Sequence, residues 1–313
     1  MLRHLLSITL ILFFMNGYSQ KVSRIDPPNW WVGMKNQKLQ LMVYGQNIST
    51  ANVSINYKGV ILESIEKVEN PNYLFLNLTI SSDAVSGKLP IEFKFPKGKP
   101  LVTQYELKDR EKGSAERKGF DNSDVVYLIV PDRFSDGNSC IDSVKGMPDK
   151  HNRKEPYARH GGDLQGIINH LDYFNQLGVT SLWMTPVLEN NQPQWSYHGY
   201  AITDFYKIDA RFGTNELYKY FVNQAHSKNV KVIKDLIFNH CGGEHWWVKD
   251  LPSADWFNQW PQFTRTNYRI PTIFDIHASE SEKKLMNNGW FDHHMPDLNQ
   301  KNPFVANYLL QNS

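Results

Sequence analysis

The stretch VKVIKDLIFNH, residues 230–240, decides how the second half of this chain is interpreted. Its apolar residues predict a buried β-strand over 230–238, and Asp235, Asn239 and His240 bring polar groups into the strand and to its end. If the strand is regular, Asp235, Ile237 and Asn239 share one side of it. A charged aspartate is costly to bury alone in an apolar strand, so we expect Asp235 to have a partner.

Two earlier apolar runs, VVYLIV at 125–130 and TSLWMTP at 180–186, also predict strands. Apolar residues at helical spacing follow over 167–177 and again over 214–225, where Thr214 can cap the helix. This alternation is typical of parallel strands joined by right-handed crossovers, and it predicts that 125–130 is buried on both faces. A doubly wound sheet and a (β/α)₈ barrel fit equally well, although no phosphate-binding glycine fingerprint follows the first strand.

The first part of the chain has a different pattern, with short alternating runs between turn residues. These runs predict strands at 39–44, 53–57, 73–80 and 91–95. We therefore expect residues 20–110 to form an Ig-like antiparallel β-sandwich that serves as a binding or packing module. Residues 111–123 are charged and contain glycine, as linkers do, and the α/β part extends over 124–313.

The N-terminus has the pattern of a secretory signal peptide. Arg3 and His4 precede an apolar run over 5–15, and small residues at Gly17 and Ser19 suit cleavage after Ser19. We expect a cleaved peptide over 1–19 and a periplasmic or secreted protein; an N-terminal membrane anchor is the alternative. No other run of about 18 apolar residues follows.

The bulk composition is that of a folded soluble protein, with 41% hydrophobic and 21% charged residues. The net charge is +2 and no block of like charge occurs, which argues against nucleic acid or an anionic membrane as a partner. Two cysteines, Cys140 and Cys241, could form a disulfide, but two buried free thiols are the favoured interpretation.

The loop after the strand at 125–130 is rich in oxygen-bearing side chains. Asp136, Asn138 and Asp142, together with Asp163, could surround a Ca²⁺ ion. Their spacing is not that of an EF-hand, and loops of this composition often only form turns. A calcium site and a structural turn both stay open on the pattern alone.

Four motifs together resemble the α-amylase family of glycoside hydrolases, and within it the cyclomaltodextrinase/neopullulanase branch. They are DLIFNH at 235–240, MPDLN at 295–299, SYHGYAITDFY at 196–206 and HGGDLQG at 160–166. A β-sandwich ahead of a barrel also matches that branch. The resemblance covers nearly all of the chain after residue 20, and it implies that 124–313 contains the first three βα units of a (β/α)₈ TIM barrel.

The resemblance also implies roles for individual residues. Tyr200 would stack on the glucose unit that is attacked, His198 and His240 would bind its hydroxyls, and Asp235 would hold an arginine from the fourth barrel strand. The calcium ligands implied are Asp136, Asn138, Asp142, Gly161 and Asp163, although Ile141 stands where the branch commonly has another side-chain ligand. Residues of about 241–294, rich in tryptophan, would form an inserted subdomain that covers the cleft.

The implied chemistry is retaining hydrolysis of α-glucosidic bonds in maltooligosaccharides, cyclodextrins or pullulan. In that family the nucleophile Asp, the acid/base Glu and a third Asp follow barrel strands four, five and seven, and no Gly-x-Arg-x-Asp segment occurs in residues 1–313. We therefore expect the catalytic carboxylates beyond Ser313 and no activity from this fragment alone, while the full-length parent is a possible homodimer. A non-catalytic α-glucan-binding protein and a non-functional product of a truncated gene are the alternatives.

Overall fold

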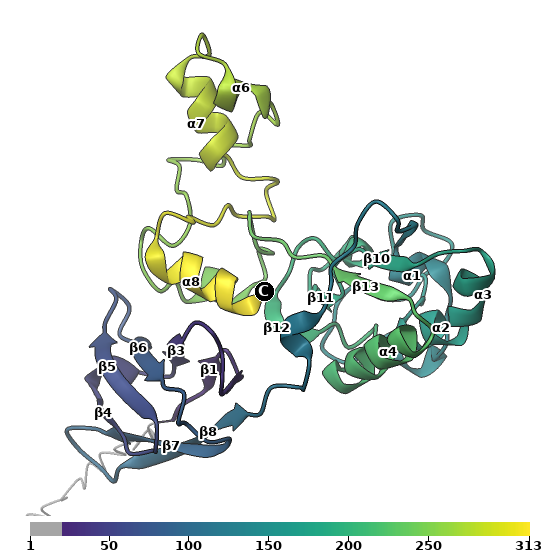
Figure 1. Ribbon diagram of the computed structural model, residues 1–313. Helices are drawn as coiled ribbons and strands as arrows, with labels where there is room; N and C mark the ends of the chain where they lie inside the picture. The colour runs from purple at the N-terminus through teal and green to yellow at the C-terminus, as the bar shows by residue number, and fades with distance from the viewer. Residues whose placement is uncertain (1–20) are drawn as a thin grey trace, which may run out of the picture.

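The computed structural model describes residues 21–313, so the predicted signal peptide lies outside the described residues. The described chain forms an N-terminal β-sandwich, a unit built on a parallel sheet, and a long segment between its third strand and the last helix (Figure 1). No helix among residues 21–313 is both long and apolar enough to cross a membrane.

The sandwich consists of two four-stranded sheets. One has the order β1 (Arg24–Asp26), β3 (Lys38–Tyr44), β6 (Tyr73–Ile80), β5 (Val60–Glu66), and the other β2 (Asn29–Trp31), β8 (Leu101–Lys108), β7 (Gly87–Lys94), β4 (Asn52–Ile55). Leu41, Leu76, Ile91 and Phe93 are fully buried in the core of the sandwich. The strand predicted at 73–80 is confirmed residue for residue, whereas the one predicted at 53–57 ends at Ile55.

The prediction of a purely antiparallel sandwich is wrong at one pair, because β2 runs parallel to β8. Strand β1 belongs to the other sheet, and only Pro27 and Pro28 separate it from β2. The chain therefore crosses between sheets within two residues and reaches the edge beside β8 without the reversal that a hairpin would provide.

The parallel sheet has the order β13 (Lys231–Lys234), β10 (Ser181–Met184), β9 (Val126–Ile129), which confirms the predicted parallel pairing. Helices α2 (Leu164–Asn169) and α3 (Leu171–Gln176) connect β9 to β10, and α4 (Asn215–Ser227) precedes β13. The Thr214 hydroxyl accepts a hydrogen bond from the Leu217 amide at 3.1 Å, so the predicted cap is confirmed. A small hairpin of β11 (Leu188–Glu189) and β12 (Asp204–Ile208) follows β10.

The prediction that 125–130 is buried on both faces is wrong. Tyr127 packs edge-on against Phe174 of α3, but Val126 and Leu128 on the opposite face are 41% and 53% exposed. Trp183 of β10 is also exposed, so the helices cover one face of this sheet and leave an apolar face open.

The strand predicted over 230–238 is shorter than expected, because β13 ends at Lys234. Beyond it the backbone leaves the sheet and pairs with the MPDLN segment, where Leu298 donates to the Asn239 carbonyl at 2.9 Å and His240 forms a bridge with Asp297. Asp235, Ile237 and Asn239 therefore do not share one side of a regular strand.

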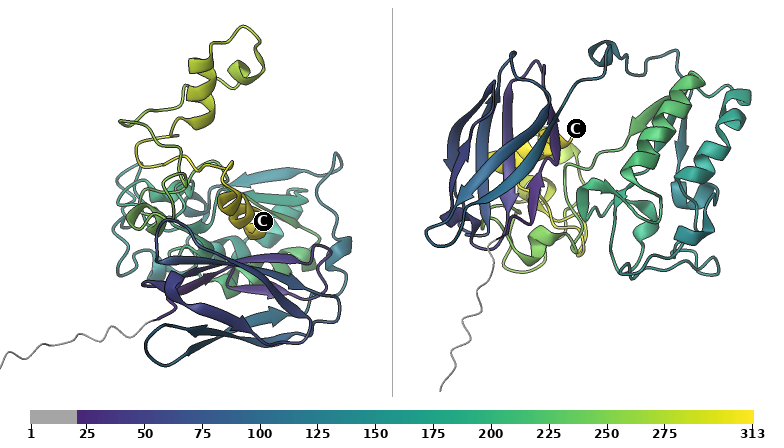
Figure 2. Two further views of the ribbon diagram at one scale, coloured as in Figure 1. Left: turned by 90° about the vertical axis from the view of Figure 1, so that its left-hand side faces the viewer. Right: turned by 90° about the horizontal axis from the view of Figure 1, so that it is seen from below.

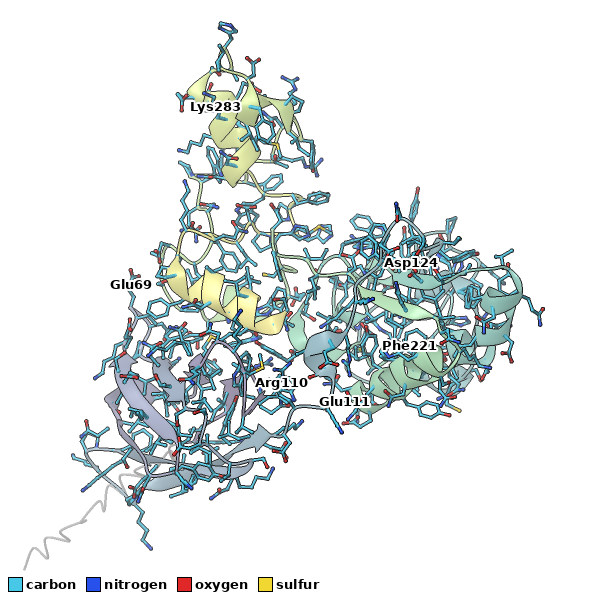
Figure 3. The ribbon with its side chains drawn as sticks, in the orientation of Figure 1. Glu69, Arg110, Glu111, Asp124, Phe221 and Lys283 are labelled. Atoms are coloured by element: carbon cyan, nitrogen blue, oxygen red, sulfur yellow. The ribbon has the colours of Figure 1, made fainter. Side chains whose placement is uncertain are left out.

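The remaining helices lie in loops and in the long segment after β13. They are α1 (Pro131–Phe134), α5 (Trp246–Lys249), α6 (Pro271–Phe274), α7 (Glu280–Asn288) and α8 (Pro303–Asn312), with short 3₁₀ turns η1 (Ile48–Thr50), η2 (Ser114–Glu116), η3 (Ser139–Ile141) and η4 (Ser196–His198). Helices α6 and α7 project away from the other parts in two views (Figures 1 and 2), with Lys283 near the tip (Figure 3).

Helix α8 packs against β3 of the β-sandwich (Figure 2). The Gln311 side chain accepts from the Gln40 amide and donates to the Gln40 carbonyl, both at 2.7 Å. Because β1 pairs with β3 only from Met42 to Tyr44, Gln311 satisfies backbone groups of β3 that no strand covers there.

Both cysteines are free thiols. Cys241 is buried as predicted, and burial raises its pKa well above the usual value. The prediction that both thiols are buried is wrong for Cys140, which is exposed in the turn η3.

Candidate functional site

The predicted sugar-binding residues meet where the chain leaves β10 and β13. Turn η4 carries His198 and is followed by Gly199 and Tyr200, and Asp235 follows the last residue of β13. The Tyr200 hydroxyl and the Trp183 indole N–H both donate to Asp235 Oδ2, each at 3.3 Å. Asp235 therefore has hydrogen-bond partners, as expected, although it lies just beyond the strand rather than in it, and one of the partners, Trp183, was not predicted as a site residue.

The imidazole ring of His198 lies beside Tyr200 and is neutral. Its Nδ1 accepts from the Tyr200 backbone N–H at 2.9 Å, so the neutral imidazole carries its proton on Nε2, where it is a hydrogen-bond donor. The rings of His198 and Tyr200 stack with centroids 5.8 Å apart. Burial lowers the pKa of His198 to about 4, which keeps it uncharged near neutral pH.

His240 lies beside them but is already engaged by the protein. Its Nε2 donates to the Tyr200 carbonyl at 3.0 Å, and its Nδ1 is 3.3 Å from the Asn239 amide nitrogen, which can only donate. Phe291 stacks on the ring at 5.0 Å, and burial lowers the pKa of His240 to about 4. Both ring nitrogens of His240 thus have protein partners, and His240 supports Tyr200, while its bond to a sugar hydroxyl stays a prediction.

A cavity of about 720 Å³ opens at this cluster. Its walls are His198, Tyr200, residues 236–240 and, from the segment after β13, Thr266, Tyr268, Ile270, Met286, Gly289, Phe291 and Met295. The segment after β13 therefore forms one wall of this cavity. Phe291 and Tyr268 were missed, because the path of the insertion brings them to the cavity and no sequence spacing reports it.

Asp297 of the MPDLN motif lies behind the cavity. Its carboxylate accepts from Asn258 Nδ2 at 2.7 Å and from Asn239 Nδ2 at 3.1 Å. Burial raises the pKa of Asp297 to about 7 in spite of these two donors. Through these two hydrogen bonds, the insertion and the DLIFNH motif both bind the carboxyl group of Asp297.

The predicted calcium residues occupy the loops after β9. Asp163 is committed to the backbone: its carboxylate caps α2 by accepting from Gly166 at 2.7 Å, and it also accepts from Asn138 at 2.8 Å and Gly137 at 3.2 Å. Within residues 21–313, no three His, Cys, Asp or Glu side chains gather closely enough to hold a metal ion.

Asp142 and Gly161 do meet. Asp142 Oδ1 is buried without a hydrogen-bond partner, and burial, together with the charge of Asp136, raises the pKa of Asp142. Gly161 has φ +88°, and a Cβ there would lie 2.8 Å from Asp142 Oδ1, so only glycine fits beside this oxygen. A buried carboxylate oxygen without a donor suits a hard cation such as Ca²⁺.

Two family models match this chain. The family "Alpha amylase, catalytic domain" matches residues 128–312, and "Cyclomaltodextrinase, N-terminal" matches residues 24–111. A beta/alpha-amylase from Paenibacillus polymyxa is 35% identical over 188 residues, 59% of this chain and 14% of that protein. A cyclomaltodextrinase from Geobacillus thermopakistaniensis is 36% identical over 197 residues, 59% of this chain and 30% of that protein.

Among solved structures, the crystal structure of an Anoxybacillus α-amylase superposes with a TM-score of 0.50 and 37% identity, over 60% of this chain and 37% of that one. This chain thus spans less than a third of the length of the two curated relatives above. The match of the catalytic-domain family to more than half of the chain, over the residues that form the parallel sheet and the cavity, shows that the chain belongs to the α-amylase family.

Proposed function

We propose that this chain supplies the substrate-binding part of a retaining hydrolase that cleaves α-glucosidic bonds in maltooligosaccharides, cyclodextrins or pullulan. The observation that carries the proposal is the convergence of His198, Tyr200 and Asp235 beside the cavity. Relatives that bear the names cyclomaltodextrinase and neopullulanase favour these substrates. We assign neither the nucleophile nor the acid/base to any residue among 21–313.

The proposed binding chemistry follows from the geometry. The ring of Tyr200 would offer an apolar face to a glucose unit, and aromatic rings pack well against the C–H face of sugars. The Nε2 proton of His198 would donate to a hydroxyl of the same sugar. Asp235 fixes the Tyr200 hydroxyl, so the ring is oriented before a ligand arrives.

We also propose that the parallel sheet is part of a (β/α)₈ barrel. The open face of β9 and β10, with Val126, Leu128 and Trp183, supports a barrel over a doubly wound sheet, since the latter would place helices on both faces. In a barrel this face is the interior, which further strands cover.

The binding proposal is tested by calorimetric titration of the 313-residue chain with maltohexaose and β-cyclodextrin. Replacement of Tyr200 by alanine removes the stacking face, and we expect at least a tenfold loss of affinity, about 1.4 kcal/mol. Tyr220→Ala on the exposed side of α4 is the matched control and should bind as the wild type does. Equal affinities in the wild type and Tyr200→Ala would contradict the proposal.

A Ca²⁺ ion is proposed to bind at Asp142 and the Gly161 carbonyl, with Asp136, Asn138 and Asp163 around it. It would neutralise the buried Asp142 oxygen and join the loops on which these residues lie. Thermal unfolding should show stabilisation by Ca²⁺ in the wild type and none in Asp142→Asn, whereas Mg²⁺, which loses its water less readily, should have little effect in either.

Export and assembly are proposed on the sequence pattern. Residues 1–19 would be removed as a signal peptide, which would leave a periplasmic or secreted protein. Homodimer formation is also proposed, with α-glucan oligosaccharides as the ligands.

A further inference from the structure

The turn that presents His198 and Tyr200 has little internal support. Turn η4 is a single 3₁₀ turn, and the hydrogen bond from Gly199 N to Ser196 O is long, at 3.3 Å. Both flanks are left-handed, with φ +61° at Trp195 and φ +83° at Gly199. A non-glycine residue such as Trp195 holds this conformation only when its surroundings impose it.

The surroundings act on Ser196, the first residue of the turn. It is fully buried, and its backbone N–H donates to Asp149 Oδ2 at 2.8 Å. Its carbonyl accepts from Arg159 Nη1 and from Asn190 Nδ2, each at 3.3 Å. The Asp149 bond is the shortest of these and the only one that uses a charged acceptor.

Asp149 is itself held in place. Its backbone carbonyl accepts from Arg211 Nη1 at 3.0 Å, and Arg211 is bound by both carboxylate oxygens of Asp209. Arg211 and Asp209 are almost fully buried, and Asp149 is 8% exposed. The chain therefore buries an ion pair that fixes the position of the Asp149 backbone.

Asp149 does not line the cavity, so it cannot contact a ligand there in the way that His198 and Tyr200 can. It lies in the loop after β9, whereas Ser196 lies in the loop between β11 and β12. Its hydrogen bond therefore joins two loops that no strand pairing connects at this point.

We infer that Asp149 is a positioning residue: its carboxylate fixes the Ser196 N–H, and through it the turn that presents His198 and Tyr200 to the cavity. This inference deepens the proposed function and rests on it for the effect on sugar binding. Its effect on the turn itself is independent of any ligand.

The test compares Asp149→Ala with Asp149→Asn in the 313-residue chain. The asparagine keeps an acceptor oxygen at the same reach, while the alanine removes it. Since a hydrogen bond to a charged group is strong, we expect at least about tenfold faster hydrogen exchange of the Ser196 amide and at least about tenfold weaker maltohexaose binding in Asp149→Ala. Asp149→Asn should stay within about threefold of the wild type in both.

Asp172→Ala is the matched control, because Asp172 is an exposed aspartate of α3 whose side chain contacts Lys228, far from η4 in the sequence. It should change neither quantity. If Asp149→Ala does not fold, Asp149→Ser takes its place, since a serine hydroxyl is too short to reach the Ser196 amide.

The outcomes separate the two proposals. If Ser196 exchanges at the wild-type rate in Asp149→Ala or Asp149→Ser, the positioning role is overturned. If Asp149→Asn is impaired as much as Asp149→Ala, acceptor geometry is not the cause and the inference is also overturned. If the wild type does not bind maltohexaose while Ser196 exchange rises only in the alanine or serine variant, the positioning role stands and the proposed function fails.

Discussion

At the scale of single residues, the backbone at Gly199 governs where His198 and Tyr200 lie. Gly199 has φ +83°, and a Cβ on it would meet the Pro186 carbonyl oxygen at 1.9 Å. The turn and the end of β10 therefore approach too closely for any side chain between them. The spacing between the two ring-bearing residues depends on this glycine.

Replacement of Gly199 by alanine should destabilise the chain by more than about 2 kcal/mol, since it combines a left-handed backbone with a clash against main-chain atoms. Chemical denaturation measures the loss. Gly146→Ala is the matched control, because Gly146 has φ +87° and a Cβ on it would meet nothing within 4 Å, so it should lose only about 1 kcal/mol. Similar losses in both variants would show that the close approach to Pro186 does not matter.

At the scale of elements, the parallel sheet has two unlike faces. Ile129, Leu182 and Met184 are buried under the helices, whereas Val126, Leu128 and Trp183 form an open apolar face. Adjacent exposed apolar residues on an extended sheet favour association with other apolar surfaces. This face is where we expect association between copies of the 313-residue chain to begin at high concentration.

Threonine at both Val126 and Leu128 should reduce aggregation and the binding of an apolar fluorescent dye, with little change in stability, because threonine is β-branched and strands favour β-branched residues. Light scattering and dye fluorescence measure the effect. The neighbouring Ile129→Thr change places a hydroxyl in the core and should cost about 2 kcal/mol without reducing dye binding. If the double variant aggregates as the wild type does, the open apolar face of the sheet is not the surface that causes aggregation.

At the scale of the whole molecule, the β-sandwich is attached to the rest by more than the linker through Arg110 and Glu111 (Figure 3). Arg24 of β1 donates through both terminal nitrogens to the Asp204 carboxylate of β12 at 2.7 Å, and through Nε to Asp26 at 2.6 Å. Tyr308 of α8 also donates to Asp26, at 2.9 Å. Three parts of the chain therefore share one charge network.

A second set of hydrogen bonds also joins the β-sandwich to the rest of the chain. Asp250, at the end of α5, accepts from Tyr44 at 2.8 Å and from Asn72 at 2.8 Å, and the amide of Asn70 donates to the Leu251 carbonyl at 2.9 Å. These bonds hold the start of the insertion to the sandwich. The β-sandwich thus stabilises the first part of the segment whose later residues form one wall of the cavity.

Replacement of Arg24 by alanine leaves Asp26 and Asp204 without their cation, and breaking such a buried pair costs about 3 kcal/mol or more. We expect differential scanning calorimetry to show one cooperative transition for the wild type and two for Arg24→Ala, because the sandwich and the α/β unit would unfold separately. Arg117→Ala in the exposed linker, where Arg117 pairs with Glu111, should keep one transition. A single transition in Arg24→Ala would mean that the network does not couple the two parts.

The predictions for single elements were accurate where the element depends only on residues close in the sequence. Alternation identified 73–80, and the threonine cap and apolar stripe identified α4, since both depend on neighbours close in the sequence. The same reasoning failed at Val126 and Leu128, because an apolar run does not reveal which of its faces a helix covers. It also failed at β2, where a parallel pair arises from a crossing between sheets.

The sequence by itself determined the family, the parallel α/β pattern and the convergence of His198, Tyr200 and Asp235, because those depend on motifs and on the rule that loops after parallel strands lie at one edge. Only the tertiary structure decided that His240 supports Tyr200, that Phe291 and Tyr268 line the cavity, and that Asp149 holds Ser196. The physical reason is that these contacts join segments far apart in the chain, and the direction of a hydrogen bond is set by the fold around it rather than by the residue types.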